Sequence, residues 1–310
     1  MFERLRVVIN FTNYNLFEIY KSLQIFKVLL TRNVHGYVRN IFGAGIVAPL
    51  IKDKTGDLSS VENYRPITLS PIISKIFESV LIIKYGMFLN VNDRQYGFKN
   101  GLGCNNAIFV LRNVIEYFNE RGSNVYLASL DASKAFDRVN HFQLYLTLMK
   151  RCVPVAFLNI IINWYSKLTI MVRWNTTFSD TLRIRSGVRQ GGVLSPHLFN
   201  VYADLFINSI VSKKNGCYLN RCCVACIMYA DDLMLLSASV SGLQQLLDVC
   251  ALTAKDLCLQ FNDKKSHCII LCEQPSLFYY TFKTFISHDA FAWLCSQYFW
   301  QRYCCATYKG

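Results

Sequence analysis

The sequence lacks any apolar run long enough to cross a membrane. Its longest apolar stretches, residues 41–51 and 153–162, fall short of the roughly 20 residues that a spanning helix needs. The first residues, MFERLRVVINF, carry Glu3 and have no long apolar segment before a small-residue cleavage site, so they do not resemble a secretion signal. We therefore expect a soluble, intracellular protein.

Acidic residues are scarce relative to basic ones. The chain has 33 Lys and Arg against 20 Asp and Glu, which gives a formal charge of +13 and a pI of about 9.2. Such a surface attracts polyanions, and nucleic acid is favoured over a membrane surface. The same charge is compatible with solubility alone, because net charge informs about partners and not about fold.

Cysteine is abundant, but the pattern of a metal site is missing. The thirteen cysteines, without a secretion signal, are expected to be reduced and mostly buried. Four of them precede an Asp-Asp pair: Cys217, Cys222, Cys223 and Cys226. No Cys-x₂-Cys pair has a matching partner, and a strand would direct Cys223 away from its neighbours, so zinc is not predicted.

The apolar spacing along the 310 residues predicts helices and strands in mixed order, with 53% apolar content for a core. Helices are expected over residues 16–32, 72–88, 105–120, 136–149, 154–165, 195–210 and 241–257, and strands over 45–51, 125–130, 168–173, 181–184, 224–229, 233–237 and 268–271. Pro66 and Pro71 are expected to bracket a bend. The order has no βαβ rhythm, so we predict an α+β fold whose antiparallel sheet carries helices on one face.

Carboxylates stand at the ends of the predicted strands. Asp131 closes the strand at residues 125–130, and Asp231-Asp232 lies at the tip of a predicted hairpin. Adjacent strand residues point to opposite faces, so such a pair can share a site only at a turn. Carboxylates are the ligands that hard cations prefer, and the backbone carbonyl of Ala132 could add another.

Each carboxylate also has a structural interpretation. Asp131 could cap the following helix, since Asp is favoured at helix N-termini, and we interpret Asp137 in that way. Asp231-Asp232 could be a polar turn. Spacing alone does not decide between these interpretations and a metal site.

Six sequence blocks favour the metal site. In their order along the chain, they resemble motifs of the reverse transcriptases of non-LTR retrotransposons. They are NYRPITLS (residues 63–70), QYGFKNG (95–101), SLDASKAFD (129–137), GVRQGGVLSP (187–196), MYADD (228–232) and LQFNDKKS (259–266). The first two resemble fingers blocks and the others palm blocks. Each is weak alone, but their order over residues 45–271 makes a chance match improbable.

The resemblance implies a right-hand polymerase with fingers and palm. Residues 1–125 would form a fingers-like region with an N-terminal helix, and residues 126–273 a palm whose antiparallel sheet is backed by helices. Residues 274–310 are rich in Phe, Tyr, Trp and Cys without a period, and they do not resemble a thumb. The thumb is therefore expected to be missing, as in a truncated or frameshifted copy, unless this tail is a divergent segment.

The implied activity is RNA-directed DNA polymerisation, with an RNA template, a DNA primer and deoxynucleoside triphosphates as partners. Asp131, Asp231 and Asp232, with the carbonyl of Ala132, would hold two Mg²⁺ ions, or Mn²⁺ in their place. Lys265 would protonate or shield the departing pyrophosphate. Because Lys264 is adjacent, the match to the family's lysine could instead fall on Lys264. The family often has glycine where Cys258 stands.

Four further residues match nucleotide-binding positions of the family. Phe136 matches the aromatic gate that excludes a ribose 2′-hydroxyl. Gln190 and Gly191 match the motif beneath the incoming nucleotide and template, and Arg65 matches a fingers arginine that clamps the triphosphate. Each has a structural alternative. Phe136 could be a core side chain, Gln190 and Gly191 could lie in a plain loop, and Arg65 could be a solvated surface charge.

Three other functions compete with an active reverse transcriptase. A catalytically silent remnant would at most bind nucleic acid through the basic surface. A group II intron maturase would carry a thumb and an RNA-binding extension. An RNA-dependent RNA polymerase usually has Gly before the Asp pair and no ring at Phe136. The sequence indicates neither the oligomeric state, nor the compartment, nor the RNA that is copied.

Overall fold

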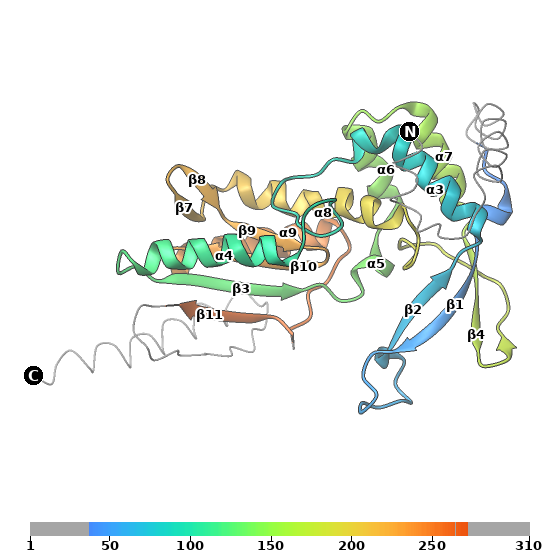
Figure 1. Cartoon of the computed structure of the whole chain (residues 1–310), viewed down its shortest axis with the longest axis horizontal. Helices are drawn as coiled ribbons and strands as arrows, with labels where there is room; N and C mark the ends of the chain where they lie inside the picture. The colour runs from blue at the N-terminus through green and yellow to red at the C-terminus, as the bar shows by residue number, and fades with distance from the viewer. Residues whose placement is uncertain (1–36, 264, 272–310) are drawn as a thin grey trace, which may run out of the picture. The chain divides into compact units, whose positions relative to one another are not determined.

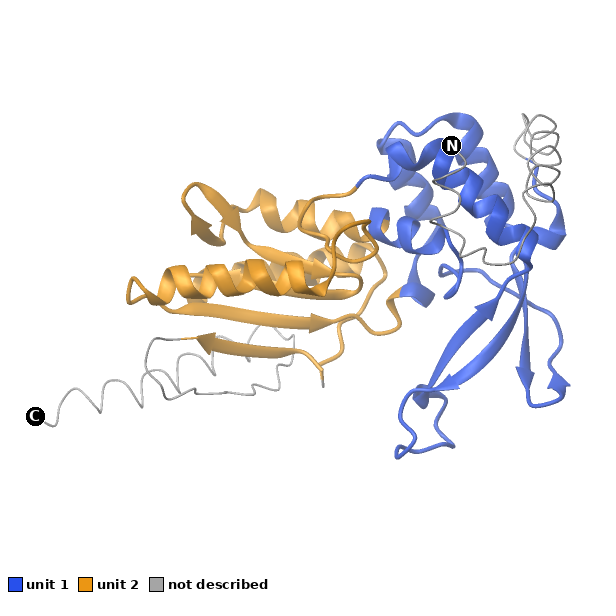
Figure 2. Ribbon diagram, viewed as in Figure 1, with its two compact units in different colours: residues 1–90, 136–201 blue, residues 91–135, 202–310 orange. Residues whose placement is uncertain are grey.

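The computed structural model describes residues 37–263 and 265–271 (Figure 1). The helix expected at residues 16–32 and the tail at 274–310 lie outside this part of the chain. None of the helices within it is long and apolar enough to span a membrane. Backbone contacts divide the chain into two interleaved units, residues 1–90 with 136–201 (unit 1) and residues 91–135 with 202–310 (unit 2) (Figure 2).

Unit 1 is built around a mixed sheet with the strand order β2-β1-β4-β5, in which β6 also pairs with β4. Its strands are β1 (Ala44–Ile51), β2 (Tyr64–Leu69), β4 (Thr169–Trp174), β5 (Thr177–Phe178) and β6 (Leu182–Arg183). β1 is antiparallel to β2 but parallel to β4, starting with Ala44 opposite Thr169. The expectation of antiparallel pairing is therefore wrong for this pair. Parallel strands need a long crossover, and more than a hundred residues separate β1 from β4.

Pro66 lies inside β2, and the chain leaves this strand only at residues 70 and 71, before α3. Pro66 is the register partner of Pro49 in β1. On the other side of β1, pairing with β4 ends at Val47. Pro49 therefore removes no hydrogen bond from the β1–β4 ladder, which is how a sheet tolerates a proline.

The helical part of unit 1 packs on aromatic side chains. Its helices are η2 (Asn40–Phe42), η3 (Val61–Asn63), α3 (Ile72–Tyr85), η4 (Gly86–Leu89), α5 (Ala135–Arg138), α6 (His141–Lys150) and α7 (Val155–Tyr165). The Phe77 ring of α3 lies 5.1 Å from Phe42 and 5.3 Å from Trp164 of α7, centroid to centroid. Phe77 and Trp164 are buried, as expected for a core that joins these helices.

The single helix expected over residues 136–149 is two helices, α5 and α6. Asn140 begins the second, because its side chain accepts a hydrogen bond from the backbone N–H of Gln143 at 3.2 Å. Asp137 is therefore not the cap that we predicted. It lies within α5, and its carboxylate accepts a hydrogen bond from Gln190.

Unit 2 contains a four-stranded antiparallel sheet with the strand order β11-β3-β10-β9. The strands are β3 (Val125–Asp131), β9 (Cys226–Tyr229), β10 (Asp232–Ser237) and β11 (His267–Leu271), and β7 (Cys217–Leu219) pairs with β8 (Cys222–Val224) separately. The helices of this unit are α4 (Cys104–Asn119) and α9 (Val240–Asp256), and α8 (Ser195–Ser212) is divided between the two units after Val201. This confirms the α+β class with an antiparallel sheet.

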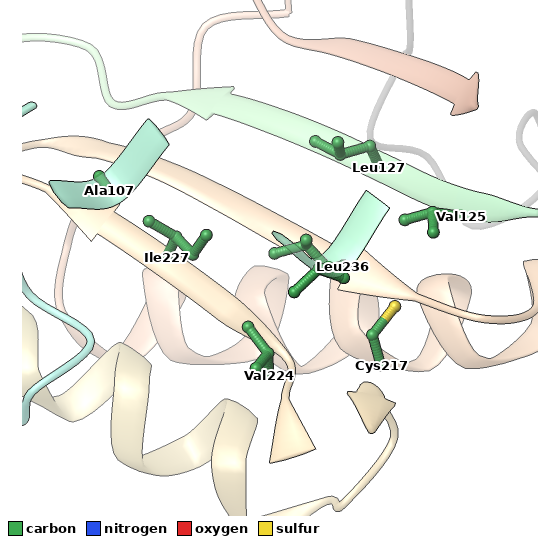
Figure 3. Packing of buried hydrophobic residues seen from close by; sticks show 8 residues of the cluster. Ala107, Val125, Leu127, Cys217, Val224, Ile227 and Leu236 are labelled. Carbon is green, nitrogen blue, oxygen red and sulfur yellow. The ribbon is translucent and has the colours of Figure 1, made fainter. Parts of the chain in front are cut away.

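One hydrophobic cluster of unit 2 joins α4 to one face of the sheet. Its eight buried side chains are Ala107, Val114, Val125, Leu127, Cys217, Val224, Ile227 and Leu236 (Figure 3). Leu236 and Leu127 are register partners. Leu233 and Leu235, which alternate with Leu236 along β10, are also buried, and α9 contacts β10 and β3. Both faces are therefore covered, so the expectation of helices on one face is wrong.

The two units differ from the expected division at residues 125 and 126. Residues 91–124 belong with unit 2, because α4 packs on β3 and β9. Residues 136–201 belong with unit 1, because β4 pairs with β1. Long-range pairing of this kind leaves no mark in the local sequence pattern.

Cysteine burial is mixed. All nine cysteines in the described part of the chain are free. Cys217, Cys226, Cys250 and Cys268 are buried, whereas Cys104, Cys152, Cys222 and Cys258 are exposed. The prediction of mostly buried cysteines is therefore wrong for this part. Burial raises the pKa of Cys217 and Cys226 to about 12, which keeps both as unreactive thiols at neutral pH.

Candidate active site

Two of the predicted carboxylates lie opposite each other at one end of the unit 2 sheet. Asp131 is the last residue of β3 and Asp232 the first residue of β10, and they are register partners in this antiparallel pair. Directly opposed residues point to the same face with Cβ atoms about 5 Å apart. The sheet thus brings together two carboxylates that are about a hundred positions apart in sequence.

The electrostatics of this pair reflect two negative charges in a partly buried place. The pKa of Asp232 is raised, first by burial and then by the charge of Asp131, while Lys265 opposes the rise. The Nζ atom of Lys265 lies 3.9 Å from Oδ2 of Asp131, and its side chain is 67% exposed. Lys264, the alternative for this position, lies outside the described residues.

Asp231 occupies a two-residue turn beside the pair. Tyr229 and Asp232 are partners at the end of the β9–β10 hairpin, which leaves Ala230 and Asp231 as the turn. Ala230 has a φ of 56°. The first turn residue thus adopts the left-handed conformation that glycine usually fills.

The donor set partly fits a hard cation. A cation between Asp131 and Asp232 would relieve the repulsion that raises the pKa of Asp232. Ala132 forms a bridge with Phe261, and the flanking hydrogen bonds, Ser133 N–H to Gln260 and Asn262 N–H to Asp131, direct its carbonyl away from Phe261. Residues 37–263 and 265–271 nevertheless hold no cluster of three or more His, Cys, Asp or Glu side chains arranged for a metal. The structure therefore joins Asp131 with Asp232, and convergence of Asp231 stays a prediction.

In unit 1, Gln190 and Gly191 lie in a loop that packs against β2. The backbone carbonyl of Gln190 accepts from the N–H of Thr68 at 2.7 Å, and its side chain donates to Asp137 at 3.2 Å. Gly191 has a φ of +106°, and a Cβ there would lie 2.8 Å from the Thr68 carbonyl oxygen. Only glycine allows this backbone and this close approach together.

A buried ion pair supports the same loop. The Nη2 atom of Arg189 lies 3.2 Å from Oε1 of Glu78, and their side chains are 4% and 2% exposed. The other oxygen of Glu78 accepts hydrogen bonds from the N–H groups of Val193 and Leu194. Burial raises the pKa of Glu78, and the Arg189 charge and these N–H groups oppose the rise.

Arg189 also ties the loop to the start of the unit 1 sheet. It donates to the carbonyl oxygens of Phe42 and Ala44, and its guanidinium lies 5.3 Å from the Trp164 ring centroid. Glu78 and Arg189 were not among the predicted site residues. Arg189 stands inside the GVRQGG block, which was the available signal, whereas no local pattern identifies Glu78.

The remaining predicted residues of unit 1 are Phe136 and Arg65. The Phe136 ring stacks on Phe199 with centroids 4.4 Å apart and planes inclined by 12°. Arg65 is exposed on β2, opposite Leu50 of β1. Phe136, Arg65, Gln190 and Gly191 thus belong to one unit, and the carboxylates and Lys265 to the other.

Comparisons with known proteins agree with the motifs. The family described as "Reverse transcriptase (RNA-dependent DNA polymerase)" matches residues 51–295. The chain is 29% identical over 195 residues to the Retrovirus-related Pol polyprotein from type-2 retrotransposable element R2DM of Drosophila melanogaster, which covers 63% of this chain and 18% of that protein. It is 29% identical over 224 residues to the RNA-directed DNA polymerase from mobile element jockey of the same species, covering 68% and 24%.

The fold is also found among solved structures. Apo telomerase from Candida tropicalis, truncated from the C-terminal domain, is similar with a TM-score of 0.56 at 14% identity, over 75% of this chain and 51% of that one. At this identity the likeness concerns the fold alone. The chain spans about a fifth of the length of the first curated relatives. The resemblance to non-LTR retrotransposon proteins is confirmed, and the chain belongs to the reverse transcriptase (RNA-dependent DNA polymerase) family.

Proposed function

We propose that this chain is an RNA-directed DNA polymerase, which adds deoxynucleotides to the 3′-hydroxyl of a DNA primer along an RNA template. One observation carries the proposal: Asp131 and Asp232 are register partners, with Lys265 beside them. Family membership and the net charge of +13 support polyanionic partners. Names of relatives such as "RNA-directed DNA polymerase from mobile element jockey" state the same activity for those proteins.

The carboxylates would act as metal ligands. Asp131, Asp231 and Asp232, with the carbonyl of Ala132, would hold two Mg²⁺ ions, or Mn²⁺ in their place. When bound, such ions stabilise the attacking and leaving oxygens of an in-line displacement. The carboxylates must be ionised for this, and the mutual repulsion of Asp131 and Asp232 makes a cation the natural counter-charge.

Lys265 would serve the leaving group. Its ammonium lies near Asp131 and is largely exposed, so it can move toward a departing pyrophosphate and protonate or shield it. Lysine provides three donors on a flexible stem, which suits a moving phosphate oxygen.

Unit 1 would bind the incoming nucleotide. The Phe136 ring, held flat by Phe199, would exclude a ribose 2′-hydroxyl. Gly191 lets the backbone approach the nucleotide and template, and Gln190 lies beside it in the same loop. Arg65 would clamp the triphosphate, because its planar guanidinium matches phosphate oxygens.

In the terms of a right-hand polymerase, we assign the unit 2 sheet to the palm and the unit 1 sheet to the fingers. The residues Asp131 and Asp232 lie on β3 and β10 of the unit 2 sheet, and Arg65 lies on β2 of the unit 1 sheet. The expectation of a missing thumb concerns residues 274–310, which lie outside the described residues.

Primer extension on an RNA template tests the proposal. We expect Mg²⁺-dependent products from the full chain, and loss of nearly all product in Asp232→Asn. The matched control is Asp256→Asn, the same change at an exposed position of α9 in the same unit. If the full chain binds the primer–template duplex but yields no product, it is the catalytically silent remnant instead.

A further inference from the structure

The QYGFKNG block lies along the outer edge of the unit 2 sheet. Gln95 forms a parallel bridge with Met228 of β9. The N–H of Tyr96 donates to the Met228 carbonyl at 2.8 Å, and the N–H of Met228 donates to the Arg94 carbonyl at 2.8 Å. A block that resembles fingers motifs thus contacts the strand that leads into the Asp-Asp turn.

The Gln95 side chain forms hydrogen bonds with the backbone of that turn. Its Oε1 accepts from the N–H of Ala230 at 3.0 Å, and its Nε2 donates to the Ala230 carbonyl at 3.1 Å. Oε1 also accepts from the N–H of Gly97 at 2.9 Å. Gln95 is 1% exposed, so these bonds form away from solvent and water cannot replace them readily.

Ala230, the residue that Gln95 bonds to, has a strained backbone conformation. Ala230 has a φ of 56°, a conformation that costs energy for a residue with a Cβ. Gly97 closes over the same peptide, since a Cβ at Gly97 would lie 2.3 Å from the Ala230 nitrogen. The Gln95 amide satisfies both polar groups of Ala230 in this conformation, and so stabilises the turn against relaxation.

We infer that Gln95 is a positioning residue of the carboxylate site, which sets the direction of Asp231 and Asp232 by holding Ala230 between Tyr229 and the pair. This rests on the proposed function, because it assigns the site a metal. Gln95 would act through the turn and not as a ligand, because its amide bonds to the backbone of Ala230 and Gly97. Its contribution is the rigidity of the turn, which a metal site needs from its supporting residues.

Two substitutions separate hydrogen bonding from volume. Gln95→Met keeps nearly the length and volume of the side chain, adds no charge, and can form none of the three hydrogen bonds to Ala230 and Gly97. Gln95→Leu removes the same bonds and also shortens the side chain. Gln245→Met is the matched control, because Gln245 is an exposed residue of α9 in the same unit.

The test is Mn²⁺ binding followed by electron paramagnetic resonance, alongside primer extension in Mg²⁺. We expect Gln95→Met to weaken Mn²⁺ binding and to raise the Mg²⁺ concentration for half-maximal extension by about 10- to 100-fold. The KM for primer–template and the far-ultraviolet circular dichroism should stay near wild type. Gln245→Met should match wild type in every readout.

The outcomes separate this inference from the polymerase proposal. If wild type yields no product but its Mn²⁺ binding requires both Asp131 and Gln95, the positioning role is supported and the polymerase proposal is overturned. If wild type extends primers and Gln95→Met equals it in Mn²⁺ affinity and Mg²⁺ dependence, the positioning role is overturned. If wild type binds no Mn²⁺ through Asp131 and Asp232, both proposals are overturned. Should Gln95→Leu fail to fold, Gln95→Met alone decides.

Discussion

Two loops that carry predicted site residues are stabilised by different interactions. In unit 1, the loop with Gln190 and Gly191 is supported by the Glu78–Arg189 ion pair. In unit 2, the turn with Asp231 is supported by the neutral amide of Gln95. All three supporting side chains are buried.

The difference follows from what each loop must present. A buried positive charge in place of Gln95 would attract the carboxylates that the cation must bind, because Coulomb interactions are strong where water is excluded, and Gln95 is 1% exposed. A neutral amide stabilises the turn and leaves the field of the carboxylates unchanged. The unit 1 loop carries no cluster of like charges, so a charged pair can join it to α3 and to the start of β1.

The largest stability effect is expected from breaking the ion pair. Glu78→Leu leaves the Arg189 charge buried without its partner, which should cost about 3–5 kcal/mol of unfolding free energy. Chemical denaturation measures this. The double variant Glu78→Leu/Arg189→Met should lose less than the sum of the two single variants, since no buried charge remains. Additive losses would show that the pair is not coupled.

Removing the neutral support should cost less. Gln95→Leu removes the side-chain hydrogen bonds that Gln95 makes with the backbone of Ala230 and Gly97, which should reduce the unfolding free energy by about 1–3 kcal/mol. Gln245→Leu, at an exposed position, serves as the control in the same denaturation experiment. A loss as large as that of Glu78→Leu would contradict the contrast between charged and neutral support.

A smaller effect is expected from crowding the turn. Gly97→Ala places a Cβ against the Ala230 backbone, so the turn must shift, at a cost of about 1 kcal/mol. Gly103→Ala is the matched control, because nothing lies within 4 Å of a Cβ there. Thermal unfolding of both variants compares them. Equal midpoints would mean that the Gly97 contact is not tight in solution.

The smallest effect is expected from an ion pair in solvent. Arg112 and Glu116 of α4 pair at 2.6 Å, but their side chains are 75% and 52% exposed. Arg112→Ala should leave the unfolding midpoint within experimental error, because solvent and salt screen such pairs. A clear, salt-sensitive loss would show that burial is not what separates this pair from Glu78–Arg189.

The sequence pattern predicts those parts of the fold that depend on local periodicity. The helices at α3, α4, α7 and α9, and the strands β1 and β3, lie close to the expected ranges. The break at Asn140 was missed because the apolar spacing continues through it, and only the capping bond shows the new start. The parallel pairing of β1 with β4 is tertiary, and no local pattern encodes it.

The sequence motifs predict the carboxylates of the candidate site, but they do not predict the buried side chains that support its loops. Asp131 and Asp232 were identified from strand ends and blocks, although only the β3–β10 register shows that they face each other. Gln95 and Glu78 bond to residues 135 and 111 positions away, which spacing cannot reveal. Cys258 has a φ of 53° after α9, which explains why glycine suits the turn where the family often has it.

Affinity cleavage with Fe²⁺ and ascorbate tests most directly whether the β3–β10 carboxylates form the metal site. Fe²⁺ bound in place of Mg²⁺ generates hydroxyl radicals that cut the nearby backbone. Cuts are expected around Asp131 and around Asp231-Asp232, competed by excess Mg²⁺ and absent from Asp131→Asn/Asp232→Asn. Cuts confined to other segments, or cuts that persist in the double variant, would contradict a metal-dependent polymerase centred on these residues.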